Sequence, residues 1–352
     1  MGKKRITLPA DFRELVKSGD IDALKAVFLR NVIGMPPWGL TKEPALSIRQ
    51  IPDELVRWLV EQGADINARD KYQRTPLYSQ AGTWSGNIPL FLELGAELEA
   101  VDYQNQTPLH AAVNYYRTQA VRDLVAHGAN VHAVNKSGNT PLSKALLQCR
   151  NSDIADMLEI SHILLDAGAV ITPEMKESVK NIGKSFEFAR SNFNKERLSE
   201  TAEALDSLYK LFDVEPVAAR VMHDGVSRIE VNSTRWQDQH QELWELLIPA
   251  SGHALTVQGE VIRITGRISH EIMNNGGGNW DADFRKMLKA LLLHFASGTP
   301  LDPTHLKEAA DLAGYLRHGN GNDEPARLCE LAVNWVLANP QPVSLPQPDY
   351  KR

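Results

Sequence analysis

Apolar residues in the first half of the chain recur at helical spacing in short paired segments. In AVRDLVAHG, Val121, Leu124 and Val125 lie three and four positions apart, which places them on one face of a helix. The preceding TPLHAAV carries a helix start, because Thr107 can cap the first turn and Pro108 fits within it. The pattern predicts a pair of short helices, each with one buried stripe.

This pair belongs to a repeat. The prolines of KEPALSI, RTPLYSQA, QTPLHAAV and NTPLSKAL are Pro44, Pro76, Pro108 and Pro141, at spacings of 32, 32 and 33 residues. A second phrase recurs at almost the same spacing, as QGADINA, LGAELEA, HGANVHA and AGAVITP. Repetition at this period is typical of a solenoid, in which each unit buries its apolar face only against its neighbours.

Residues 8–172 resemble an array of about five ankyrin repeats, which couple TPLH at the start of one helix with a GADVNA-type phrase after the next. The resemblance is strongest at 102–135 and good at 70–102. EPAL replaces TPLH in the unit at 41–70, and residues 8–31, with a turn at Gly19 and Asp20, resemble a capping helix pair. The last GA phrase follows the previous one by 40 residues, so we expect a lengthened connection in that unit. The resemblance implies an all-α solenoid of helix pairs with short β-hairpin loops.

The period ends after Val170, and longer helical patterns follow. We expect an α-helical domain at 173–338 that caps the stack, and a Pro-rich, extended and exposed tail at 339–352. A short β-like run, SRIEV, interrupts the helical patterns. Ser233, Asn279 and Asp302 are expected to precede helix starts. The expected helices are 173–193, 198–212, 233–249, 254–274, 280–297, 303–318 and about 324–338.

The helix expected at 254–274 is unusual, and a strand over VIRITGRI is the alternative. Gly259 and Gly266 lie seven apart on one helix face, where each costs about 1 kcal/mol relative to alanine, so close packing against a neighbour should compensate. Glu260, Arg263 and Arg267 are also neighbours. Either they form an ion-pair network, or Arg263 and Arg267 bind an anionic ligand such as a carboxylate or phosphate.

The resemblance implies that a partner binds the concave face, built from the loop tips and the first helix of each pair. Five of the eight tyrosines lie between positions 72 and 116, and aromatic side chains dominate interface energetics. Packing between repeats is the alternative, which we expect for Tyr78, and His110 is expected to be structural. The expected partner-binding residues are Lys71, Tyr72, Arg74, Trp84, Tyr103, Gln104, Gln106, Asn114, Tyr115, Lys136, Ser137 and Asn139.

Composition narrows the class of protein. The 352 residues are 43 % hydrophobic and 23 % charged, as in a soluble globular protein, and no apolar run reaches signal-peptide or membrane-spanning length. Cys149 and Cys329 are far apart and have no CxxC partner, so we expect neither a disulfide framework nor a zinc site. The same cysteine usage predicts a cytoplasmic location. A net charge of −6 gives no general attraction to nucleic acid.

Other candidate chemistry is weak. NNGGGNWD lacks the Lys-Ser/Thr of a P-loop, SHEI lacks the second histidine of a zinc protease helix, and His223 with Asp224 has no nucleophile elbow. Trp236, His240 and Trp244 share a helix face, which indicates core packing. We therefore expect no catalytic residue, cofactor or metal.

The sequence thus predicts a cytoplasmic, non-enzymatic module that binds a protein partner, with no membrane or nucleic-acid role and no indication of oligomeric state. One form is an inhibitor or immunity-type protein, and the second half, with a formal charge of about −5, would suit a basic target. The alternative is a targeting arm attached to a catalytic or anionic-ligand-sensing helical domain built on Glu260, Arg263, Arg267 and His270.

Overall fold

A computed structural model of the chain describes residues 12–30 and 44–352. They form two compact units. The first contains the residues up to Ser185 together with Lys195–Val217, and the second contains Phe186–Asn194 with Ala218–Arg352. Every named element of the described residues is helical, which confirms the all-α class. SRIEV forms no strand, so that β expectation is wrong. The loop tips of the repeats are tight turns closed by backbone hydrogen bonds, without an assigned strand.

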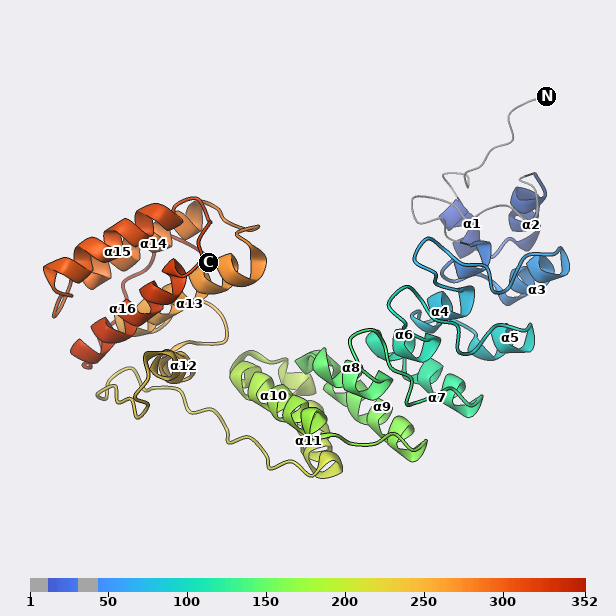
Figure 1. The fold of residues 1–352 in the computed structure, drawn as a ribbon, viewed down its shortest axis with the longest axis horizontal. Coiled ribbons are helices and arrows are strands. Elements are labelled where there is room, and N and C mark those ends of the chain that lie inside the picture. The colour runs from blue at the N-terminus through green and yellow to red at the C-terminus, as the bar shows by residue number, and fades with distance from the viewer. Residues whose placement is uncertain (1–11, 31–43) are drawn as a thin grey trace. The chain divides into compact units, whose positions relative to one another are not determined.

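The first unit stacks its helices in two rows (Figure 1). α4, α6 and α8 pack against one another in one row, and α5, α7, α9 and α11 follow one another in the second row. The elements are α1 (Phe12–Ser18), α2 (Ile21–Arg30), η1 (Ala45–Ser47), α3 (Asp53–Glu61), α4 (Pro76–Ala81), α5 (Ile88–Glu93), α6 (Pro108–Asn114), α7 (Thr118–Ala126), α8 (Pro141–Leu147), η2 (Asn151–Asp153), α9 (Ile154–Asp166), the start of α10 (Pro173–Ala189) and α11 (Lys195–Phe212).

The repeated Thr-Pro-Leu phrase forms each inner helix as the sequence predicts. In α6, the Thr107 side chain accepts a hydrogen bond from the His110 amide, Pro108 occupies the first turn, and Leu109 is buried. α4 and α8 begin in the same way. The late GA phrase has two causes: η2 lengthens the connection before α9, as predicted, and α9 itself has 13 residues, whereas α7 has 9.

Both ends of the first unit carry additional helices. α1 and α2 form the expected helix pair, with Gly19 at a φ of +68° between them and Leu24 and Phe28 buried; residues 8–11 and 31 lie outside the described part. At the other end, Tyr209 of α11 occupies the space that a side chain on Gly183 of α10 would need. The compact unit therefore extends to Val217, whereas the repeat period ends near residue 170.

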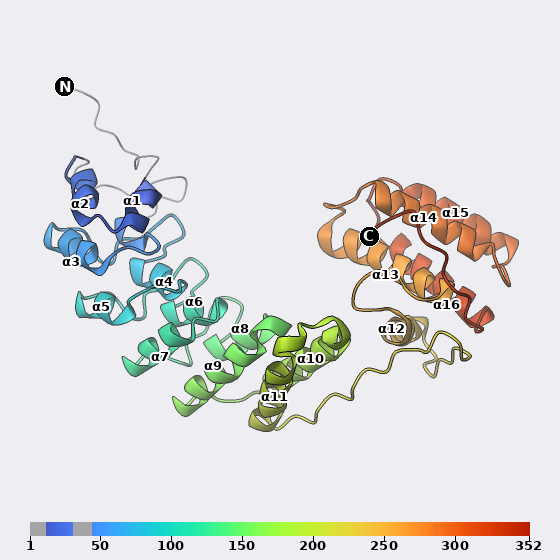
Figure 2. The same cartoon turned by 180° about the vertical axis from the view of Figure 1, so that it is seen from behind.

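The second unit is built around α13, which packs against α12, α14 and α16 (Figure 2). Val261, Ile264 and Ile268 of α13 are fully buried, so the strand alternative for this segment is wrong. The elements are η3 (Arg190–Asn192), α12 (Trp236–Leu247), α13 (Val257–Asn275), α14 (Ala282–Phe295), α15 (Pro303–Leu316) and α16 (Glu324–Ala338).

The two glycines of α13 make close packing possible, as expected. A Cβ on Gly259 would lie 2.7 Å from the Cβ of Ala254, and one on Gly266 would lie 2.9 Å from Cε3 of Trp244 on α12. The absence of side chains at these positions therefore lets α13 approach its neighbours.

Two of the predicted helix starts are wrong. Asp302 caps α15 as expected, by accepting hydrogen bonds from the Thr304 and His305 amides. However, α12 begins after Arg235 rather than Ser233, and Asp281 caps α14 in place of Asn279. The carboxylate of Asp281 accepts from two amides of the first turn, for which an aspartate is as suitable as an asparagine.

Candidate functional site

Three loop tips of the first unit have the same construction. In the tip before α6, Oδ1 of Asp102 accepts hydrogen bonds from the amides of Gln104 and Gln106, both at 2.8 Å. The turn also places Asn105 at a φ of +59°. Asp70 binds the amides of Tyr72 and Arg74, and Asn135 those of Ser137 and Asn139, in the same way. Each Asp or Asn thus fixes the direction of the exposed residues that follow it.

Neighbouring tips are joined to each other. The Tyr103 amide donates to the Tyr72 carbonyl at 2.9 Å, and the Lys136 amide donates to the Gln104 carbonyl at the same distance. The rings of Tyr72 and Tyr103 have centroids 5.7 Å apart, and Nζ of Lys71 lies 4.8 Å from the Tyr72 centroid. The tips therefore form one continuous row of aromatic and polar side chains.

A groove of about 410 Å³ runs between these tips and the inner helices. Six of the residues expected to bind a partner line it, namely Tyr72, Arg74, Tyr103, Gln106, Asn114 and Tyr115. The other six do not line it: Lys71, Trp84, Gln104, Lys136, Ser137 and Asn139. Sequence reasoning missed other lining residues, among them Ser47, Arg49, Ser79, Gly82, Thr83 and Lys144. We name this surface the tyrosine groove.

Trp84 lies beside the tyrosine groove and is 80 % exposed. The guanidinium of Arg117 stacks on its indole, and Nε of Arg117 donates to the Gly82 carbonyl at 3.3 Å. A Cβ on Gly82 would lie 3.0 Å from Cδ2 of Tyr115, so glycine allows the Tyr115 ring to lie against the backbone. Gly82 and Arg117 thus position two exposed aromatic rings.

The charged groups of the tyrosine groove differ in their partners. Arg74 binds Asp70, with Nε at 2.7 Å from Oδ2. Burial lowers the pKa of Lys144, and burial followed by the charge of Arg49 lowers the pKa of Arg117. Tyr78, expected only to pack between repeats, is half-buried and also lines the groove; burial and then the charge of Asp102 raise its pKa.

His110 is structural, as predicted. Its ring is fully buried, Nδ1 accepts from the Thr107 amide at 3.2 Å, and Nε2 lies 3.1 Å from the Asn139 carbonyl oxygen. Burial lowers the pKa of His110, so the ring stays neutral and joins two repeats.

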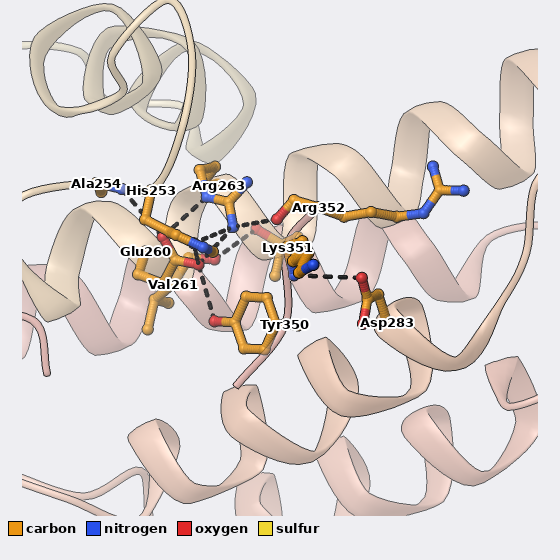
Figure 3. A network of polar contacts seen from close by, with 10 residues as sticks. His253, Ala254, Glu260, Val261, Arg263, Asp283, Tyr350, Lys351 and Arg352 are labelled. Atoms are coloured by element: carbon orange, nitrogen blue, oxygen red, sulfur yellow. Dashed lines mark hydrogen bonds and ion pairs between the residues drawn. The ribbon is translucent and has the colours of Figure 1, made fainter. Parts of the chain in front are cut away.

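In the second unit, Glu260 and Arg263 form the predicted ion pair at the centre of a buried network (Figure 3). Nε and Nη2 of Arg263 donate to the Glu260 carboxylate at 2.8 and 2.6 Å. Nη2 also donates to the backbone oxygen of Arg352 at 2.7 Å. Arg263 is 1 % exposed, so it cannot bind an external anion together with Arg267, and that expectation is wrong for Arg263.

The same network holds the tail, which the sequence predicted to be exposed. The Tyr350 hydroxyl donates to Oε1 of Glu260 at 2.8 Å, its side chain is 3 % exposed, and the Lys351 amide donates to Asp283 at 3.2 Å (Figure 3). The Leu345 amide also donates to the Leu255 carbonyl. The tail lacks helix but is anchored. An aromatic residue within this polar, Pro-rich segment is the signal that could have indicated burial.

Arg267 has a different environment from Arg263. It is exposed and lines a second groove of about 730 Å³, with the aromatic rings of Trp236, Trp244 and Phe284 and polar groups that include His270. Although the residue as a whole is exposed, partial desolvation of its guanidinium against the groove, then the charge of Arg263, lowers the pKa of Arg267. Trp236, His240 and Trp244, expected in the core, are half-buried along this groove, with Trp244 packed on Gly266.

The His223 and Asp224 pair has a serine nearby but not the geometry of a nucleophile and base. Oγ of Ser227 lies 3.3 Å from Nε2 of His223, while Nδ1 of the same ring accepts from the Gly225 amide at 3.0 Å. The ring proton is therefore on Nε2, which faces Ser227 and cannot accept its proton. Asp224 instead binds the amides of Val226 and Ser227.

The remaining features are possible metal ligands, the two cysteine thiols and the hydrophobicity of the helices. Over residues 12–30 and 44–352, no cluster of histidine, cysteine and carboxylate side chains has the composition of a metal site. Cys149 and Cys329 are both free, and burial raises the pKa of each thiol to about 12. Within the same residues, none of the helices combines the length and hydrophobicity needed to span a bilayer.

In the first unit, capped helix pairs stack on one another, the His110 ring joins two of them, and neighbouring loop tips are hydrogen-bonded to each other. Residues 80–172 match the family model of ankyrin repeats in three copies, and this part of the chain consists of ankyrin repeats. Ankyrin repeats are generally protein–protein interaction modules. The match ends at residue 172. No curated protein matches the chain.

Proposed function

We propose that the first unit is a non-enzymatic module that binds a partner protein along the tyrosine groove and the adjacent Trp84. The observation that carries this proposal is the row of exposed aromatic rings. Tyr72, Tyr103 and Tyr115 line the groove and are 36 %, 49 % and 52 % exposed, and Trp84, joined to Tyr115 through Arg117, is 80 % exposed.

These rings are held in place before any partner arrives. The Tyr72 ring lies tilted against the Tyr103 ring, and Arg117 lies over both Trp84 and Tyr115. Rings that are already ordered lose little conformational entropy on binding, while each offers a large area to bury. Tyrosine, tryptophan and arginine are also the residue types that most often carry binding energy in interfaces.

The test is a pull-down from native lysate with the intact chain and with a variant in which Tyr72, Trp84, Tyr103 and Tyr115 are alanine. The matched control is Tyr315→Ala, which removes an exposed tyrosine of the second unit. Thermal melting should show that all three proteins are equally folded. We expect the intact protein and the control to retain one partner that the quadruple variant loses. Equal retention by the quadruple variant would contradict the proposal.

Within this function, we propose that the protein acts in a reducing, cytoplasmic compartment, because its two cysteines are free and far apart in sequence. An inhibitor or immunity-type role is the form that such a rigid, pre-ordered surface suits. That form predicts that the captured partner is an enzyme or toxin whose activity falls when the protein is added.

Arg267 supports a second candidate function, in which the second unit senses a small anion. The residue lines the groove of about 730 Å³ with His270 and the indole rings, and forms no ion pair within the described part of the chain. Calorimetric titration with inorganic phosphate and with citrate tests this. Binding that Arg267→Gln abolishes would support the candidate function, and no heat of binding with either probe would exclude it for these anions.

A further inference from the structure

Two of the three basic side chains that line the tyrosine groove form no ion pair within the described chain, whereas the third, Arg74, binds Asp70. Arg49 and Lys144 line the groove and form no ion pair with another described residue. Arg117 lies close enough to Arg49 for the two charges to repel, and it contacts aromatic rings rather than a carboxylate. Lys71 and Lys136 are exposed on the neighbouring loop tips.

The acidic side chains of the same surface already accept hydrogen bonds from other groups of the chain. Asp102, the acidic residue that lines the groove, is 6 % exposed, and its Oδ1 accepts two backbone hydrogen bonds. Asp70 is 4 % exposed and holds both its own turn and Arg74. The charge of Asp156 on α9 acts to raise the pKa of Arg117, but Asp156 does not line the groove. The groove thus presents positive charge on a chain whose net charge is −6.

Basic side chains that form no ion pair, beside exposed aromatic rings, favour an occupant that brings negative charge. Arg117 and Lys144 are partly desolvated, so a carboxylate beside them would gain more than it would at a fully exposed lysine. We propose that the partner protein presents an acidic segment, rich in Asp or Glu, to the tyrosine groove. This inference rests on the proposed function, and it names the chemistry of the partner.

A protein segment fits this surface better than a nucleic acid does. Nucleic-acid surfaces are usually broadly basic and neutralise many phosphates at once. Here the unpaired basic groups Arg49, Arg117 and Lys144 are few, and the rest of the chain would repel a long polyanion because of its net charge of −6. A short acidic segment can reach the groove without meeting that repulsion along its whole length.

The test uses fluorescence anisotropy with the full chain and three labelled probes of equal length: the peptides (Glu-Ser)₆ and (Lys-Ser)₆, and an oligouridylate of twelve nucleotides. The charge-reversal variant is Arg49→Glu with Lys144→Glu, two residues that line the groove. The matched control is Lys180→Glu on α10, an exposed lysine of the same unit outside the groove. The Tyr72, Trp84, Tyr103 and Tyr115 alanine variant is measured alongside.

We expect the acidic peptide to bind most tightly, and charge reversal to weaken it by about tenfold or more while Lys180→Glu leaves it unchanged. Added salt should weaken the same complex, because screening is substantial above about 0.1 M. Preference for the lysine peptide or the oligonucleotide would overturn the inference, as would acidic-peptide binding that survives charge reversal.

The pull-down separates this inference from the proposed function. Loss of the captured partner by both the charge-reversal and the quadruple alanine variants supports both statements. A partner that is lost by the alanine variant but kept by the charge-reversal variant overturns the acidic segment and leaves the proposed function in place. A partner kept by both variants overturns both.

Discussion

The guanidinium carbon of Arg117 lies 3.8 Å from the centroid of the Trp84 indole, although the two residues belong to successive repeats. Even with this contact, Trp84 is 80 % exposed. Because Trp84 buries little area in the isolated chain, we predict that Trp84→Ala changes the free energy of unfolding by less than about 1 kcal/mol.

The same substitution should weaken partner binding by about tenfold or more, because a pre-ordered tryptophan is a typical interface anchor. Thermal melting and a binding titration with the captured partner measure the two effects. A large loss of stability with unchanged affinity would mean that Trp84 serves packing rather than recognition.

Two helical glycines of the second unit should respond oppositely to alanine. A methyl group on Gly266 would overlap the Trp244 ring, and Gly266→Ala should destabilise the unit by about 1–3 kcal/mol. Gly314 of α15 has no heavy atom within 4 Å of the same position, so Gly314→Ala should stabilise the protein by up to about 1 kcal/mol. Urea unfolding of both variants measures the difference, and equal effects would contradict the close packing of α12 on α13.

The tail should contribute to stability through Tyr350. Tyr350→Phe removes the hydroxyl that donates to Glu260 at 2.8 Å and leaves a buried carboxylate with one donor fewer. We expect a loss of about 1–3 kcal/mol, since unsatisfied buried charge is costly. Tyr315→Phe is the control, because that ring is 58 % exposed. If both variants melt at the wild-type temperature, the tail is not anchored through this hydroxyl.

The free energy of unfolding should decrease as the pH is lowered, because His240 is protonated more easily in the unfolded state. Burial lowers the pKa of His240 to about 4, whereas the unfolded residue titrates near about 6.5. Between these values the unfolded state binds the extra proton, so the free energy of unfolding falls as the pH falls from about 6.5 to about 4. At about 1.4 kcal/mol per pKa unit, the full loss is about 3 kcal/mol.

His240→Gln removes this titration and can retain a hydrogen bond to Thr265, which lies 3.1 Å from Nε2 of His240. Urea unfolding from pH 7 to pH 4 should therefore show a flatter profile for the variant than for the wild type. Glu260 contributes separately at lower pH: burial would raise its pKa, but Arg263 and the other hydrogen-bond donors outweigh burial and lower it. Its stabilisation is lost as the carboxylate is protonated. Parallel profiles down to pH 4 would contradict the assignment to His240.

The helix pairs of the first unit were predictable because their signals are local. Thr107 and Pro108 determine how a helix starts, and Gly128, at a φ of +86°, ends the next one within a few residues. The repeat adds information, because each unit contacts its neighbours in the same way. The positions of Tyr72, Tyr103 and Tyr115 in the tyrosine groove were predicted from the same alignment of the repeats.

The remaining features depend on contacts between distant positions. Glu260 and Tyr350 are 90 positions apart, and no local pattern indicates that the tail returns to α13. Arg49 and Lys144 reach the groove only because the repeats stack, so neither is marked by its neighbours in sequence. Arg263 and Arg267 share helical spacing, but a small rotation around α13 buries one and exposes the other.

Photo-crosslinking tests the central claim most directly. Tyr103 of the tyrosine groove is replaced by p-benzoylphenylalanine in one protein, and Gln119 of α7, an exposed residue outside the groove, in another. After irradiation in native lysate, we predict that position 103 forms a covalent adduct with one partner protein and that position 119 does not. Adducts of the same partner from position 119 alone, or equally from both positions, would contradict binding in the groove.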